Sequence, residues 1–381
     1  MQLSLVNATR KPMLDLGTII NVAATDRGTE MARTEVAFMR VCRSRSAVAL
    51  TALAALVVLG YGSSSPAVSP KAASTPSPSL TGTPTLANVA SAGSLQLLMD
   101  KYLGPPFIAQ TGDEYQNQSA GSVGLGQEIA AGEITPNVFV PIGSAAMSLV
   151  EPTFTTWAVQ FAASPLVVAY YPQGPYASQL KQIAEGKLPI SQLFTLLATP
   201  GFKLGRTDPT VDPQGQGFVE MVDLAQQFLG ISSTTASAVL GGTDPSSEIF
   251  SETALEPTLQ AGELDAASAY LPQAVQLGLP YVTLPNQINF GDPADASTYQ
   301  SASLTLSTGK VVQGSLLDLE ASVLSTASNP APPAATAFVE YLLSPATRNL
   351  LKKEGYTLLT PTLLGNAAAA PQGIRDLTTT S

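Results

Sequence analysis

An Asp-Pro pair at a helix start is the stretch of this sequence with the clearest potential for chemistry. Asp212 suits the position that caps a helix, and Pro213 suits its first turn. Apolar residues then recur with helical spacing until Gly230 ends the pattern. The free N–H groups of a helix start attract anions, and Gly215 and Gly217 would let a ligand approach the backbone. The alternative is that Asp212 only caps its own helix.

Two further polar loops have the same setting. Gly93-Ser94 and Gly121-Ser122 each follow a candidate strand and precede a candidate helix. In open α/β sheets such loops gather at the carboxyl ends of the strands, where ligands bind. Each loop alone is ordinary turn chemistry. Three in one chain, with Arg206 as the one basic residue nearby, indicate an anion held by neutral donors.

Composition excludes several other chemistries. The 381 residues include no histidine and one cysteine, Cys42, so Ser-His-Asp sets, Cys-His sets and His/Cys zinc sites are ruled out. The net charge of −10 argues against nucleic acid as a partner. Ser178 and Lys181 match the Ser-x-x-Lys pattern of penicillin-binding enzymes, but they sit in an ordinary amphipathic helix without a Lys-Thr-Gly partner. An exported serine hydrolase is therefore the weaker alternative.

The ends of the chain predict export. Residues 1–38 lack apolar periodicity and are expected to be a mis-assigned or disordered N-terminus. Residues 39–61 form a signal peptide with a basic start and a short apolar run, and 62–85 form a Ser/Pro/Thr-rich tether. Tyr61 stands where a lipoprotein would carry its lipidated cysteine, so we expect a periplasmic, cell-surface or secreted protein. The Ala/Thr-rich residues 366–381 are expected to be a disordered tail.

Between these ends, candidate strands and helices alternate. That alternation predicts an α/β fold with largely parallel sheets. Leu264–Tyr270 is a candidate buried strand, and Ile249–Ala261 is a candidate helix that contains Glu252. On its own pattern, Glu252 is a first-turn residue that complements the helix dipole, and Tyr270 is a core tyrosine.

The order of these motifs resembles the periplasmic molybdate- and tungstate-binding proteins of ABC importers, in particular their archaeal-type branch. The resemblance covers about residues 87–365. It is carried by Ala92-Gly93-Ser94-Leu95, Ala120-Gly121-Ser122-Val123, Ile134–Phe139, Phe161–Ala169, Asp212-Pro213-Gln214-Gly215, Ser251-Glu252-Thr253, Gly262-Glu263-Leu264-Asp265, Tyr270 and Leu284–Asn289.

The resemblance implies a type II periplasmic-binding-protein fold, with two α/β lobes joined by a hinge of two crossing strands. One lobe would be 86–166 plus 272–365, and the other 167–271. The implied ligand is tungstate or molybdate, with no cofactor, an ABC transporter permease as partner, no enzymatic activity and a monomeric state. The implied ligand-binding residues come from both lobes: Gly93, Ser94, Ser122, Asp212, Pro213, Gln214, Glu252 and Tyr270.

Two carboxylates beside a dianion need a physical reason. At about 4 Å each like-charge pair would repel by ~4 kcal/mol at an effective dielectric of about 20. Mo(VI) and W(VI) are large, hard centres that can accept extra oxygen ligands, so Asp212 and Glu252 could bind the metal centre itself. The same carboxylates would repel sulfate. The alternatives are another tetrahedral oxyanion, with a carboxylate accepting the proton of hydrogen phosphate, and a sensor or adhesin that keeps only the fold.

Overall fold

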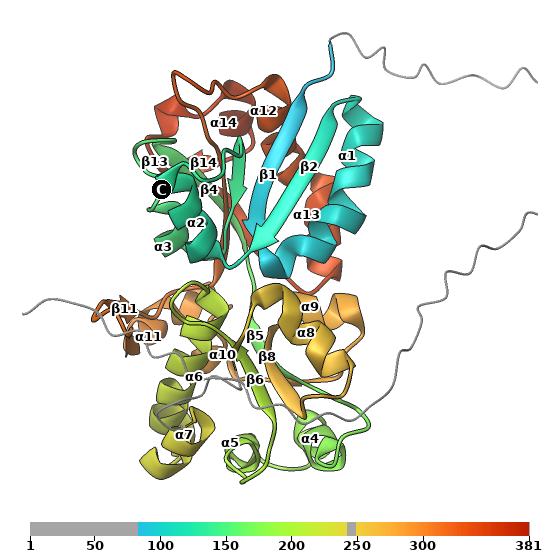
Figure 1. Cartoon of the computed structure of the whole chain (residues 1–381), viewed down its shortest axis with the longest axis vertical. Coiled ribbons are helices and arrows are strands. Elements are labelled where there is room, and N and C mark those ends of the chain that lie inside the picture. Colours follow the sequence, from blue (N-terminus) through green and yellow to red (C-terminus); the bar gives the residue numbers. More distant parts are fainter. Residues whose placement is uncertain (1–82, 242–248, 381) are drawn as a thin grey trace, which may run out of the picture. The chain divides into compact units, whose positions relative to one another are not determined.

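The computed structural model describes residues 83–241 and 249–380 of the chain (Figure 1). The expectations for 1–38 and 39–61, and those for 62–82 within the tether, lie outside the described residues. Within the described part, no helix is long and apolar enough to cross a membrane.

The first lobe is built on a seven-stranded sheet of order β14-β13-β4-β12-β3-β1-β2. Its strands are β1 (Leu86–Ala92), β2 (Glu114–Ala120), β3 (Val138–Val140), β4 (Trp157–Ala163), β12 (Asp318–Val323), β13 (Thr357–Gly365) and β14 (Thr379–Thr380). Its helical segments are η1 (Gly93–Leu95), the π-helical η2 (Leu98–Leu103), α1 (Gly104–Thr111), α2 (Ser122–Ala131), α3 (Ser144–Met147), α12 (Pro333–Leu342), α13 (Pro345–Lys353), η5 (Ala367–Ala369) and α14 (Gln372–Asp376).

The second lobe is built on a five-stranded sheet of order β7-β6-β8-β5-β9. Its strands are β5 (Leu166–Tyr170), β6 (Leu204–Thr207), β7 (Ile249–Phe250), β8 (Ala266–Tyr270) and β9 (Tyr281–Thr283), and β10 (Ser303–Thr305) forms a separate hairpin with β11 (Val311–Gln313). Its helical segments are α4 (Ala177–Ala184), α5 (Ser191–Leu197), α6 (Pro213–Leu229), α7 (Ser233–Val239), α8 (Glu252–Gln260), α9 (Leu271–Leu277), α10 (Asn286–Asn289), η4 (Pro293–Asp295) and α11 (Ala296–Tyr299).

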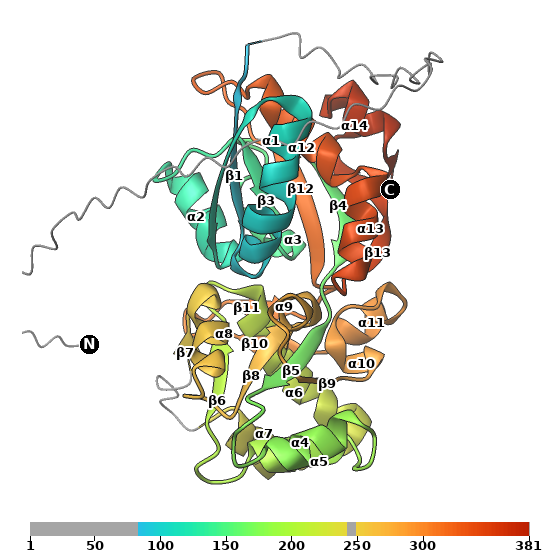
Figure 2. The same cartoon turned by 90° about the vertical axis from the view of Figure 1, so that its right-hand side faces the viewer.

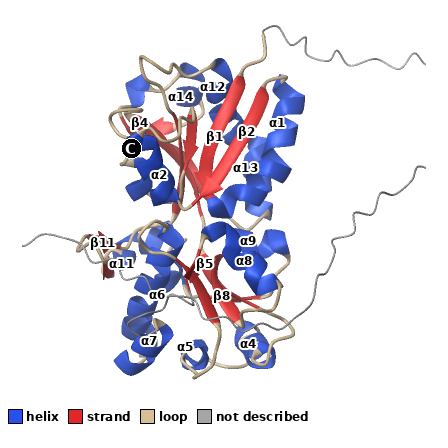
Figure 3. Ribbon diagram, in the orientation of Figure 1, coloured by secondary structure: helices blue, strands red, loops and turns tan. Residues whose placement is uncertain are grey.

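Helices cover the sheets because strands and helices bury their apolar residues against one another (Figure 3). In the first lobe, α2 and α12 both pack on β1. In the second lobe, α6 and α8 both pack on β6 and β8. The small side chains of Ala266, Ala267 and Ala269 in β8 are fully buried and allow this close approach. These contacts fix the helix starts that follow the strands.

Two crossing segments join the lobes. The chain leaves the first sheet at the end of β4 and enters β5 after two residues (Figure 2). It returns through β12, where Asp318 pairs with Ala163. The amide of Ser164 donates to the carbonyl of Leu317 at 2.8 Å, so the two crossings lie side by side. Two α/β lobes with this double crossing confirm the type II periplasmic-binding-protein fold.

The structure corrects the expected strand directions. Parallel pairs such as β1 with β2 and β6 with β8 are as expected. The strands next to the crossings run the other way: β12 is antiparallel to β3 and β4, and β5 is antiparallel to β8 and β9. A strand that arrives from the other lobe enters its sheet from the opposite end. The sheets are therefore mixed rather than largely parallel.

The structure also corrects the expected lobe boundary after residue 271. The prediction assigned 272–365 to the first lobe, but β9 pairs with β5 of the second sheet, and the chain returns only at β12. The partner of β9 is a strand more than a hundred residues earlier in the chain, and no local sequence pattern specifies such a pairing, which explains the error.

The C-terminal residues are ordered structure rather than the expected disordered tail. Ile374 on α14 is fully buried, Ala370 is nearly so, and β14 extends the first sheet beside β13. The short α14 packs on α12. One buried isoleucine among small residues was too weak a pattern to predict this.

Candidate functional site

Asp212 serves two purposes at the start of α6. Its Oδ1 accepts a hydrogen bond from the amide of Gln214 at 2.8 Å, so the helix is capped as its sequence predicts. Its Oδ2 is buried without a hydrogen-bond partner of good geometry among the described residues. Pro213 occupies the first turn, as expected. The capping alternative is therefore correct for one oxygen and leaves the other available.

Glu252 begins α8 and reaches across to the first lobe. The amide of Gly93 donates to its Oε2 at 2.7 Å. A Cβ atom added to Gly93 would lie 2.7 Å from that oxygen, so the contact requires glycine. Burial raises the pKa of Glu252 to about 7, while the neighbouring polar groups of Ser94 and the amide of Gly93 act to lower it. The loop expected to bind an anion thus holds a carboxylate of the other lobe.

The loop at Ser122 makes the second contact between the lobes. The amides of Val123 and Gly124 both donate to the carbonyl of Val211 at 3.1 Å. The hydroxyl oxygen of Ser122 accepts from the amide of Ile142 at 3.1 Å, so its hydrogen can still be donated. The helix start at Ser122 therefore lies beside the residue that precedes Asp212.

Tyr270 completes the group at the end of β8. Its side chain is fully buried, and its hydroxyl has no hydrogen-bond partner among the described residues. Burial raises the pKa of Tyr270 well above its ordinary value, and the charges of Asp212, Glu252 and Glu256 raise it further. Burial also raises the pKa of Asp212 well above its ordinary value, with Glu252 adding to the effect. These groups are close enough to interact electrostatically.

Sequence reasoning missed Glu256, which stands one helical turn after Glu252. Its side chain is 3% exposed, and its Oε1 has no hydrogen-bond partner among the described residues. Burial raises its pKa to about 8, and Asp212 contributes. The i, i+4 spacing of Glu252 and Glu256 on one helix was the available signal. No lysine or arginine of the described chain is among the main causes of these pKa shifts.

A pair of glutamines supports the site from behind. Nε2 of Gln214 donates to Oε1 of Gln273 at 2.9 Å, and the same Oε1 accepts the amide of Tyr270 at 3.0 Å. Oε1 of Gln214 accepts a bond from the Ser268 hydroxyl at 3.3 Å. Gln214 therefore fixes the end of β8 relative to α6 through Gln273, a residue that the sequence did not single out.

A cavity of about 300 Å³ borders the site on the side of α8 and is lined by Gly93, Ser94, Glu252 and Glu256 among others. Among the described residues, no group of three or more His, Cys, Asp and Glu side chains is arranged to hold a metal ion.

The pair considered for a serine hydrolase lies elsewhere in the structure. Ser178 and Lys181 are exposed on α4, and Lys181 pairs with Glu185 at 3.9 Å.

The sequence model of a family of bacterial extracellular solute-binding proteins matches residues 87–357. The chain belongs to this family, which confirms the solute-binding class and agrees with export. A molybdate/tungstate-binding protein of Pyrococcus abyssi is 27% identical over 284 residues, which are 69% of this chain and 80% of the relative. A Haloferax volcanii protein named as a putative molybdenum-binding protein of an ABC transporter is 30% identical over 227 residues, which are 60% of this chain and 68% of the relative. Among solved structures, the periplasmic molybdate-binding protein of Azotobacter vinelandii has a TM-score of 0.47 at 14% identity, covering 73% of this chain and 100% of that one.

Proposed function

We propose that the protein captures tungstate or molybdate outside the cytoplasmic membrane and delivers it to the permease of an ABC importer. The observation that carries the proposal is the buried group of Asp212, Glu252 and Tyr270 at the junction of the lobes. It combines an unpartnered carboxylate oxygen with an unpartnered hydroxyl. The names of the relatives from Pyrococcus abyssi and Haloferax volcanii support the same ligand class.

The carboxylates select for the metal centre of the ligand. A tetrahedral oxyanion brings four oxygens of its own, so Asp212 and Glu252 would need to supply only two more to a six-coordinate Mo or W. Ser122, Tyr270 and the amide of Gly93 would donate hydrogen bonds to the oxyanion oxygens. For sulfate the same carboxylates offer only repulsion, because its central atom does not readily take extra ligands. No cofactor is needed for this function.

Ligand entry would use the hinge. The Gly93–Glu252 contact and the Val211 carbonyl occupy donors that an oxyanion would need. Rotation about the crossings at Ser164 and Leu317 would open these contacts, and closure on the ligand would replace them.

Delivery of the ligand to a permease by a monomeric binding protein follows from the proposed class. Tyr61 has no thiol to carry a lipid, which favours release after cleavage over lipid anchoring, and the intact mass of the exported protein tests that step.

An oxyanion panel tests the proposal. Thermal unfolding is followed with tungstate, molybdate, sulfate and phosphate at matched concentrations. A ligand at 100 times its dissociation constant adds about 2.7 kcal/mol to the free energy of unfolding. We expect tungstate and molybdate to stabilise the protein and sulfate to have little effect. Greater stabilisation by sulfate or phosphate would contradict the proposal and favour the other tetrahedral oxyanions.

A further inference from the structure

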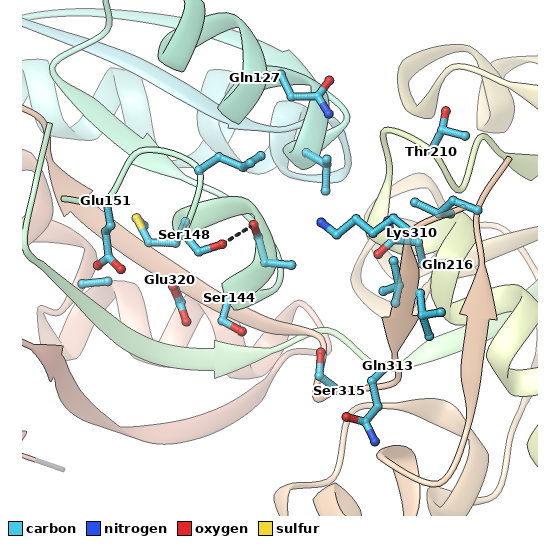
Figure 4. A pocket seen from close by; sticks show the side chains of 18 of the residues that line it. Gln127, Ser144, Ser148, Glu151, Thr210, Gln216, Lys310, Gln313, Ser315 and Glu320 are labelled. Atoms are coloured by element: carbon cyan, nitrogen blue, oxygen red, sulfur yellow. Dashed lines mark hydrogen bonds between the residues drawn. The ribbon is translucent and has the colours of Figure 1, made fainter. Parts of the chain in front are cut away.

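A second cavity, of about 550 Å³, lies apart from the expected oxyanion residues. One wall comes from α2, α3 and β12 of the first lobe, and the other from the start of α6 and the hairpin β10–β11 of the second lobe (Figure 4). None of the eight expected ligand-binding residues lines it. Its volume is within the range of small-molecule sites.

One end of this cavity is acidic. Glu320 on β12 lines the cavity and is 1% exposed, and its buried Oε1 has no hydrogen-bond partner among the described residues. Glu151 lines the cavity on the same side. Burial raises the pKa of Glu320 well above its ordinary value, and the charge of Asp318, a side-chain hydrogen bond with Asp318 and the charge of Glu151 raise it further. A buried acceptor that lacks a donor is unfavourable, so a ligand that supplies a donor to Oε1 would gain free energy.

The opposite end is basic. Lys310 stands in the turn between β10 and β11, and its side chain extends from the hairpin into the cavity (Figure 4). It is the one lysine or arginine among the described residues that line the cavity. Gln313 and Ser315 flank it with further polar groups. Asp318, the acidic neighbour of Glu320, is engaged within the protein, because its Oδ2 accepts from Nε2 of Gln160 at 2.6 Å.

The residues between the two ends are small, polar or apolar. Ser144 of α3 and Ser148, which caps the end of α3, lie on the acidic side, and the hydroxyl of Ser148 donates to the Ala145 carbonyl at 2.8 Å. Nε2 of Gln216 donates to the carbonyl of Pro209 at 2.8 Å, which leaves its side-chain oxygen and its second N–H for a ligand. Val123 and Met147 are apolar lining residues. Charged ends with a mixed middle suit a short organic molecule.

We propose that this cavity is a second ligand site, for a small zwitterion with an ammonium group at one end and a carboxylate at the other. The ammonium would donate to Glu320 and Glu151, and the carboxylate would accept from Lys310. A simple amine would leave Lys310 without a counter-ion, and a simple anion would face two carboxyl groups. An organic cation suits the acidic end better than a bare metal ion, because no three ligating side chains of the described chain are arranged for a metal.

The test varies the distance between the ammonium and carboxylate groups with a series of straight-chain amino acids. The series runs from glycine to 6-aminohexanoate, each member paired with the n-alkylamine and the carboxylate of the same length. Binding to the full exported chain is measured by calorimetry. We expect one length to bind the wild-type protein roughly tenfold or more tightly than either of its single-charge partners, because only the amino acid makes charged hydrogen bonds at both ends of the cavity.

Two variants identify which residue binds each charged end of the ligand. Lys310→Gln should weaken the best amino acid roughly tenfold and abolish its advantage over the matched amine. Glu320→Gln should abolish its advantage over the matched carboxylate. The controls are Lys187→Gln and Glu185→Gln, a surface pair joined at 2.6 Å that does not line the cavity, and they should leave binding unchanged.

The proposal is overturned if no member of the series binds wild type at roughly 10 mM, which corresponds to about −3 kcal/mol. It is also overturned if binding survives Lys310→Gln unchanged. Circular dichroism checks the fold of each variant. If Glu320→Gln does not fold, the exposed Lys310 still decides the question, because its substitution removes no buried group.

Discussion

The two acidic groups of this protein differ in what faces them. Asp212, Glu252 and Glu256 are buried with one another and with Tyr270, and no basic side chain is among the main causes of their raised pKa values. Glu320 and Glu151 line a larger cavity whose far side carries Lys310. The first arrangement favours a ligand with an electron-accepting centre. The second favours a ligand that brings its own positive charge and a negative charge for the lysine.

Buried carboxylates alone therefore do not define a cation site. A buried carboxylate with no cation must be protonated, or must bind something that accepts its electron pair.

The largest effect concerns the pH dependence of stability without ligand. The pKa of Glu252 rises from 4.5 to about 7 on folding, and that of Glu256 from 4.5 to about 8. Between these values the folded state holds more protons than the unfolded state. The stability that these two groups contribute is therefore fully present below pH 4.5 and is lost as the pH rises. We expect a loss of up to about 1.4 kcal/mol per pH unit for each group. Urea unfolding at pH 5, 6, 7 and 8 measures it.

A matched variant assigns that loss to the site. Glu256→Gln should flatten the decline between pH 5 and 8, because a neutral amide cannot lose a proton. Glu263→Gln on the exposed surface of the same lobe is the control and should leave the slope unchanged. A wild-type stability that rises over this range would show that these carboxyl groups are already ionised in the folded protein.

The second effect concerns ligand selectivity. Glu252→Gln should weaken tungstate binding roughly 100-fold at pH 7, since loss of even a supporting residue at a metal centre costs about 10–100-fold. Residual sulfate binding should change little or improve, because the substitution removes a repulsive charge. Calorimetry with both anions measures the two affinities. An equal loss for tungstate and sulfate would argue that Glu252 does not bind the metal centre.

The third effect tests the close approach of Gly93 to Glu252. Gly93→Ala would place a Cβ atom 2.7 Å from Oε2 of Glu252 and 3.0 Å from its Cβ. We expect a loss of about 1–3 kcal/mol in unfolding free energy and weaker tungstate binding, because the carboxylate must move. Gly124→Ala is the control, since its nearest neighbour would be at 3.6 Å. Similar losses in both variants would mean that the close approach of Gly93 to Glu252 does not cause the loss of stability.

The local parts of the site could be predicted from the sequence because they depend on neighbouring residues. The Asp212-Pro213 helix start, its end at Gly230 and the buried strand ending in Tyr270 are all present. The lobe boundary after 271 and the ordered C-terminus could not be predicted, because each depends on one short strand joining a distant sheet edge. The cavity at Glu320 depends on a hairpin and a strand that meet only in the folded chain.

The same limit applies to the hydrogen bonds within the site. Gly93 and Ser122 were predicted as anion donors from their loops. In the structure the Gly93 amide and the amides after Ser122 bind oxygens of the other lobe. No local pattern specifies such a partner, because the two loops are far apart in sequence. Whether the donors exchange these oxygens for a ligand remains a prediction for the oxyanion panel.

The smallest effect is the opposite salt dependence of the two sites. The tungstate dianion must approach a protein of net charge −10, which repels it. Salt screens this repulsion, so the affinity for tungstate should improve by about two- to threefold between roughly 0.05 and 0.3 M NaCl. Amino-acid binding at Lys310 should weaken over the same range, because salt screens a partly exposed ion pair. Calorimetry at each salt concentration compares the two, with sucrose at equal osmolality as the control. If tungstate binding weakens with salt, a basic group supplies part of its affinity, and the distinction between the two acidic groups fails.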